Sequence, residues 1–78
     1  MKNEMVVRHK RWYFRGSELD IVTEMRSIAF DDVADIREYM QRVSRRCEKV
    51  HGRRIDTRSA GDFLRELHEL GDIEVIKG

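Results

Sequence analysis

The sequence of 78 residues predicts one small α+β domain, spanning residues 1–78, in which three helices pack on a two- or three-stranded sheet. Three observations support this fold class. Residues near both ends of the chain are β-branched and aromatic, as in strands. Apolar residues between them recur every three or four positions, as in amphipathic helices. Cap residues and glycines mark the ends of those helical segments. The expected order of elements is therefore β(β)-α-α-α-β.

Residues 5–15 are expected to be extended, because residues 5–7 (MVV) and 12–14 (WYF) suit a half-buried pleated surface. The basic stretch 8–11 (RHKR) interrupts their alternation. No Asn-Gly or Asp-Gly marks a tight turn. One long strand with a bulge and a hairpin that turns near His9-Lys10 therefore both remain open.

A first helix begins after Gly16, where Ser17 and Asp20 form an aspartate variant of the capping box. Its apolar positions follow one stripe. They are Ile21, Val22, Met25, Ile28 and Ala29. Residues 30–32 are expected to end this helix and to cap the next.

The second helix carries a heptad-type apolar seam over five turns. The seam consists of Val33, Ile36, Met40, Val43, Cys47 and Val50. Acidic residues at the start of this helix (Asp31, Asp32, Asp35) and basic residues near its end complement the helix dipole. Gly52 is expected to stop it.

Residues 53–58 form a polar connector that contains Ile55. Ser59 is expected to cap a third helix, with Asp62 at the capping-box position and Gly71 at its end. The apolar face of this helix consists of Phe63, Leu64, Leu67 and Leu70. Residues 73–76 then form a short strand, which we expect to pair with the N-terminal strand or hairpin.

Composition excludes several classes of protein. A disordered chain is excluded because 40% of the residues are hydrophobic, they are periodic, and the net charge is only +1. One cysteine cannot form an internal disulfide, which excludes a stapled secreted mini-protein. No apolar run approaches the roughly 20 residues that span a bilayer, and the N-terminus has no signal peptide. These features predict a cytoplasmic protein that does not enter a membrane.

The residues capable of chemistry have structural explanations. Cys47 and His51 share a helix face, but Cys47 sits in the apolar seam, where a thiol acts as a small hydrophobe. The histidines His9, His51 and His68 lack zinc-ligand spacing, and the acidic cluster at the second helix lacks the calcium-loop pattern. No phosphate-binding loop, dinucleotide fingerprint or nucleophile elbow is present. We therefore expect no enzyme, no catalytic residue, no metal and no cofactor.

Charge is divided into four blocks along the chain. Residues 1–16 carry five basic side chains and one acidic side chain, a net charge of +4, and residues 42–58 carry seven and two, a net charge of +5. The blocks 17–41 and 59–78 have net charges of −5 and −3. Twelve of the sixteen basic residues are arginine, which is favoured at interfaces. The candidate binding residues are Arg8, Lys10, Arg11 and Trp12, with Arg42, Arg45, Arg46, Lys49, Arg53, Arg54 and Arg58.

Three interpretations of these blocks remain open. The first is an ion-pair network within the molecule, which is the usual role of surface charge. The second is a nucleic-acid surface, in which the Arg-rich region 42–58 contacts phosphates and the aromatic residues 12–14 stack on bases. A pI near 8.0 is low for a dedicated nucleic-acid-binding domain. The third is recognition of a protein partner or of a second copy of the chain. We expect a non-enzymatic accessory or interaction module of the third kind, with nucleic-acid binding as the alternative.

One stretch of the chain resembles a pattern in small uncharacterised proteins of bacterial and phage type. In them an aromatic strand end and a Gly-Ser or Gly-Thr helix cap precede a helix of the form E-I-V-x-x-M-R. The resemblance is carried by residues 12–17 (WYFRGS), Ile21-Val22, Met25-Arg26 and Tyr39-Met40, with Asp20 at the acidic position. The resemblance implies a bacterial or mobile-element origin and implies no activity.

Overall fold

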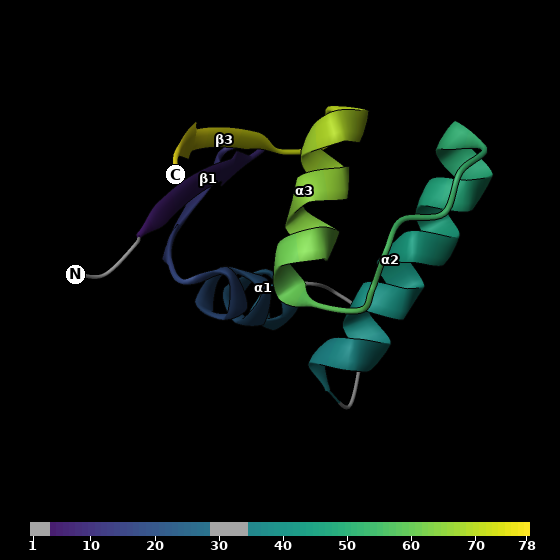
Figure 1. The fold of residues 1–78 in the computed structure, drawn as a ribbon, viewed down its shortest axis with the longest axis horizontal. Coiled ribbons are helices and arrows are strands. Elements are labelled where there is room, and N and C mark those ends of the chain that lie inside the picture. Colours follow the sequence, from purple (N-terminus) through teal and green to yellow (C-terminus); the bar gives the residue numbers. More distant parts are fainter. Residues whose placement is uncertain (1–3, 29–34) are drawn as a thin grey trace.

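The computed structural model describes residues 4–28 and 35–78, and it confirms the predicted α+β class (Figure 1). The elements are β1 (Met5–His9), β2 (Trp12–Gly16), α1 (Glu18–Ser27), α2 (Ile36–His51), α3 (Ala60–Leu70) and β3 (Glu74–Lys77). In Figure 1 the sheet lies at one end of the molecule and α2 at the other, with α3 between them. The predicted positions of Ala29, Asp31, Asp32 and Val33 lie outside the described residues.

The N-terminal segment is a hairpin rather than one long strand. Strands β1 and β2 pair in antiparallel fashion, with Val7 opposite Phe14 and His9 opposite Trp12. Residues 10 and 11 form the two-residue loop, and Lys10 has a φ of 59°. In tight two-residue hairpin turns a positive φ at the first loop position is usually taken by glycine, because a side chain is strained there. This hairpin thus turns without the residues that usually signal one.

Substitution of Lys10 by glycine is therefore expected to stabilise the protein. Removing the Cβ relieves the strain at this φ, which we expect to raise the free energy of unfolding by about 0.5–1 kcal/mol and the melting temperature by roughly 2–6 °C. Differential scanning calorimetry measures both. Lys10→Ala is the matched control, because it removes the charge but keeps the Cβ, so it should give no rise.

Strand β3 completes the sheet on the other side of β1. The strand order is β2-β1-β3, and β3 is antiparallel to β1, as the predicted pairing of the chain ends requires. Arg8 lies opposite Glu74, and their side chains form an ion pair of 2.9 Å. The C-terminal strand is therefore held by both backbone pairing and a cross-strand charge pair.

One face of the sheet is buried and the other is open. Val7 and Phe14 point into the core, where they meet buried residues of all three described helices. Phe63 of α3 is 0% exposed and makes an edge-to-face contact with Tyr39 of α2, with ring centroids 6.1 Å apart. On the opposite face of the sheet, Tyr13 is 64% exposed. This is the alternation expected of an antiparallel sheet with one solvated face.

Predicted cap residues mark four helix ends, but α2 begins after Asp35 and not after residues 30–32 as expected. The Asp35 carboxylate accepts the Glu38 N–H at 2.8 Å. Ser17 and Asp20 form the reciprocal capping box at α1, and Gly52 and Gly71 end α2 and α3 with a positive φ. At α3, Ser59 accepts the Asp62 N–H at 3.1 Å, but the Asp62 carboxylate pairs with Arg65 instead of returning to the cap. The second half of that predicted capping box is therefore replaced by an ion pair.

Among the described residues, the predicted seam of α2 is confirmed from Ile36 to Cys47 and is wrong at Val50, its last position. Met40, Val43 and Cys47 are buried, whereas Val50 is 70% exposed. Val50 faces the same side as the others, but the last turn of α2 borders an open hollow instead of a packed element. The spacing of apolar residues indicates which side of a helix they face. It does not indicate whether another element covers that side.

The connector between α2 and α3 is held against α2 by hydrogen bonds to a buried serine. Ser44 Oγ donates to the carbonyl of Ile55 at 2.9 Å and accepts its N–H at 3.1 Å. Ile55 itself enters the core. Ser44 thus satisfies both backbone groups of a buried residue in an irregular segment.

Within the described ranges, no helix has the length and apolar character needed to cross a membrane.

Candidate binding surface

Five of the predicted binding arginines pair with carboxylates of the same molecule. The pairs are Arg8–Glu74 (2.9 Å), Arg42–Glu38 (3.2 Å), Arg53 with Glu66 and Glu69 (both 3.3 Å), Arg54–Glu48 (3.0 Å) and Arg58–Asp56 (2.7 Å). Exposed pairs of this kind contribute about 0–1 kcal/mol each. An internal ion-pair network therefore accounts for a large part of the arginine excess, which leaves fewer cations for a partner.

Arg58 and Asp56 form the closest of these pairs. The Arg58 side chain donates to both carboxylate oxygens of Asp56, and its backbone N–H donates to one of them at 2.9 Å. These bonds, the side-chain bonds first, lower the pKa of Asp56 to about 2. The contact also folds the connector back on itself just before the cap of α3.

Titration of the Asp56 carboxyl by carbon-detected NMR should therefore give a pKa of about 2. In Arg58→Ala it should return toward the ordinary value near 3.8. Because the folded-state pKa lies below the unfolded one, this group stabilises the fold above about pH 4 and loses that contribution as the pH falls toward 2. An unchanged Asp56 titration in Arg58→Ala would show that another group holds the pKa down.

Lys10, Arg11, Arg45 and Lys49 form no salt bridge with any residue in ranges 4–28 and 35–78. Two of them, Arg45 and Lys10, line separate hollows. Arg45 lies beside Arg54 on the connector side of α2, where both line a shallow hollow. Lys10 and Arg46 line a different hollow, near the hairpin loop. The predicted patch 42–58 is thus split between two sides of α2.

That second hollow joins two basic segments far apart in the sequence. It has a volume of about 260 Å³ and lies between the hairpin loop, α2 and the turn that connects α3 to β3. Its rim is formed by His9 and Lys10 from the hairpin and by Arg46, Val50 and His51 from α2. Its walls and floor are formed by Met25, Tyr39, Val43, Cys47, Leu67, Asp72 and Ile73. The fold therefore places residues of charge blocks 1–16 and 42–58 around one hollow.

Asp72 contacts two polar side chains that line this hollow. One carboxylate oxygen lies 3.3 Å from His51 Nε2, and the other accepts the Cys47 thiol at 3.8 Å. Burial, and then the charge of Asp72, raises the pKa of Cys47. A buried, protonated thiol is a poor nucleophile. Cys47 and His51 therefore both contact the Asp72 carboxylate, which links α2 to the turn between α3 and β3.

Sequence reasoning did not select Asp72. It follows the predicted helix stop Gly71, and its contacts are with residues 21 and 25 positions earlier in the chain. The one local signal was a carboxylate directly after a left-handed glycine, which is common in turns. The partners could be known only from the packing of α2 against the α3–β3 turn.

Two exposed apolar side chains border the same region. Val50 lines the hollow, and Trp12, which is 49% exposed, lies across the hairpin from His9. Lys10, Arg46 and Val50 line the hollow, and Arg11, Trp12 and Lys49 are their neighbours along the chain. We name these six residues together the hairpin–α2 surface. It combines cationic groups, apolar side chains and a concave centre.

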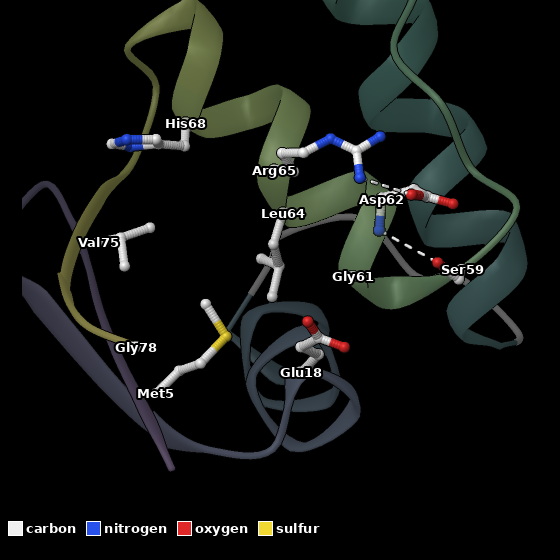
Figure 2. A pocket seen from close by; sticks show the side chains of 10 residues that line it. All are labelled: Met5, Glu18, Ser59, Gly61, Asp62, Leu64, Arg65, His68, Val75 and Gly78. Atoms are coloured by element: carbon white, nitrogen blue, oxygen red, sulfur yellow. Dashed lines mark hydrogen bonds and ion pairs between the residues drawn. The ribbon is translucent and has the colours of Figure 1, made fainter. Parts of the chain in front are cut away.

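A larger hollow of about 620 Å³ lies on another side of the molecule, between the start of α3 and the ends of β1 and β3 (Figure 2). Among its lining residues, the Asp62 N–H donates to Ser59 and the Asp62 carboxylate accepts from Arg65, as the dashed lines show. The Glu18 carboxylate lies so close to Gly61 that a Cβ there would meet Oε1 at 2.7 Å. None of the predicted binding residues lines this hollow.

Comparisons of the chain with protein-family models, with curated proteins and with solved structures return no match. The resemblance to small bacterial and phage-type proteins therefore stays a prediction. Any functional proposal rests on the geometry described above.

Proposed function

We propose that this protein is a non-catalytic interaction module that binds a protein partner through the hairpin–α2 surface. The observation that carries the proposal is the convergence of two distant basic segments around a concave apolar centre. Protein interfaces combine an apolar centre with polar and charged groups at the rim, and arginine and aromatic residues contribute most to their affinity.

The chemistry of the surface indicates the chemistry of the partner. Lys10, Arg11 and Lys49 make no internal salt bridge within the described part of the chain. A matching surface would place carboxylates opposite these cations and an apolar side chain opposite Trp12 and Val50. The partner is therefore an acidic protein segment that also carries apolar residues.

Site-specific photo-crosslinking in the native host tests this proposal. A photoreactive phenylalanine analogue placed at Trp12 or Val50 should crosslink to one partner, and the crosslinked peptide should be acidic with apolar residues. The same analogue at Leu19 or Ile76, which are comparably exposed on other parts of the surface, is the matched control. Equal crosslinking from all four positions, or none from Trp12 and Val50, would reject the surface.

The partner is a second copy of the chain if the crosslinked peptide comes from the protein itself. In that case light scattering at micromolar concentration should give a dimer mass, and Lys10→Glu/Lys49→Glu should return it to a monomer. A heterologous contact of basic on acidic surfaces would instead give larger, open assemblies.

Nucleic-acid binding is the second candidate, and one observation favours it. Trp12 is exposed next to the loop residues Lys10 and Arg11, and Tyr13 is exposed on the opposite face of the sheet. Aromatic side chains beside cations are typical of single-strand binding. Fluorescence anisotropy of a labelled 15-nucleotide DNA should then show binding whose affinity falls with salt. Engagement of four cations predicts a log–log slope of about −3. Absence of binding at low salt would remove this candidate.

A further inference from the structure

We propose that the hollow at the centre of the hairpin–α2 surface binds a carboxylate joined to a small apolar group. This is the chemistry of a peptide C-terminus that ends in a residue such as leucine, and also of a free branched-chain acid. In the first case the inference rests on the proposed function, because it names the part of the partner that enters the hollow.

The lining of the hollow matches such a ligand at both ends. Met25, Leu67 and Ile73 provide buried apolar contacts, and the rim provides Lys10 and Arg46. Ligand pockets for drug-sized molecules have volumes of about 300–1,000 Å³. A hollow of about 260 Å³ is smaller than that range, so it suits one side chain and its attached carboxylate.

Arg46 lines the hollow on its α2 side. Burial raises the pKa of Tyr39 and of Cys47, and the Arg46 charge opposes that rise. Burial lowers the pKa of His9, and the Arg46 charge adds to that lowering. These groups lie on α2 and on β1. The Arg46 charge therefore acts on side chains of both α2 and β1. A ligand carboxylate in the hollow would accept a charge-assisted hydrogen bond from its guanidinium.

The backbone at Lys10 is a second, independent indication. A φ of 59° is unfavourable for lysine, and glycine would adopt it without strain. Residues in such conformations are concentrated at binding and catalytic sites, where the side chain has a use that outweighs the cost. Here the strained residue is the one that brings an ammonium group to the rim of the hollow.

Asp72 sets the orientation of the ligand. Its carboxylate is occupied by His51 and Cys47, and it repels another anion. The ligand carboxylate must therefore lie at the Lys10 and Arg46 side, with its apolar group toward Leu67 and Ile73. Replacement of Asp72 by asparagine should accordingly strengthen binding of the acid by roughly threefold.

The test is a titration of the nitrogen-15-labelled protein followed by NMR, with four small probes. The probes are N-acetylleucine, N-acetylleucinamide, 4-methylpentanoate and acetate. N-acetylleucine and 4-methylpentanoate should shift the amide signals of residues 9–11, 46–51 and 72–73 saturably. The uncharged amide, and acetate without an apolar group, should each bind at least fivefold more weakly. Tighter binding of N-acetylleucine identifies a peptide terminus, and tighter binding of 4-methylpentanoate identifies a free acid.

Two variants make the result specific to the site. Lys10→Gly should weaken binding of the acid about fivefold while the melting temperature stays the same or rises, which separates loss of the cation from loss of the fold. Arg45→Ala, on the other side of α2, should leave the affinity unchanged. Equal affinities for the acid and its amide, shifts that map to other residues, or no saturation at tens of millimolar would overturn the proposal.

Failure of this inference is distinguishable from failure of the proposed function. If the acids do not bind but Trp12 and Val50 still crosslink to one partner, the surface docks a protein without a carboxylate in its hollow. If the acids bind and no crosslink forms, the hollow is a small-molecule site and the interaction module is rejected.

Discussion

Replacement of Phe63 by alanine is expected to lower the free energy of unfolding by about 3–5 kcal/mol, enough to leave much of the protein unfolded at 37 °C. Phe63 is fully buried and contacts Tyr39 edge to face, so its ring joins α3 to α2 at the centre of the core. A domain of this size has a single small core and little stability to spare. Loss of this one ring would therefore remove most of the free energy of unfolding of the domain.

Urea denaturation followed by circular dichroism measures the change. Leu19→Ala is the matched control, because Leu19 is 57% exposed and its truncation should cost no more than about 0.5 kcal/mol. A cost below about 1.5 kcal/mol for Phe63→Ala would contradict a core organised around this ring.

Replacement of Ser44 by alanine is the second large effect, about 2 kcal/mol of destabilisation. The hydroxyl both donates to and accepts from the backbone of Ile55, which is buried. Alanine would leave one N–H and one C=O without partners in an apolar setting, and neither can turn to water without moving the connector. The free energy of unfolding from the same urea series reports this cost.

Ser27→Ala is the matched control for that substitution. Ser27 Oγ donates to the carbonyl of Glu24 at 2.7 Å on an exposed helix end, so water can replace the bond. Its loss should change stability by less than about 0.5 kcal/mol. Equal costs at the two serines would show that the connector is not fastened by Ser44.

The helices were predictable because their signals are local. Ser17, Ser59, Gly52 and Gly71 lie within one turn of the ends that they specify, and the apolar spacing of each helix repeats within it. The hairpin was ambiguous because prediction depends on such local signals and here the local signal was misleading. Its turn contains Lys10 in a conformation that usually calls for glycine, so the local signal pointed away from the turn that forms.

The candidate surface was only partly predictable. Composition pointed to the basic segments, but whether an arginine is paired depends on carboxylates that the fold brings from elsewhere, as with Arg8 and Glu74, 66 positions apart. The same packing places Arg46 and Lys10 around one hollow and Arg45 at another, on a different side of α2. Sequence distance carries no information about any of these contacts.

The affinity of the purified protein for the partner identified by crosslinking tests the central claim most directly. Isothermal titration calorimetry should show that Lys10→Glu/Lys49→Glu weakens binding at least tenfold, because two cations of the hairpin–α2 surface then repel an acidic partner. Arg15→Glu/Arg45→Glu makes the same change in net charge away from that surface and should leave the affinity within about twofold. Equal losses in the two double variants would mean that binding follows net charge and not this surface, and would contradict the account.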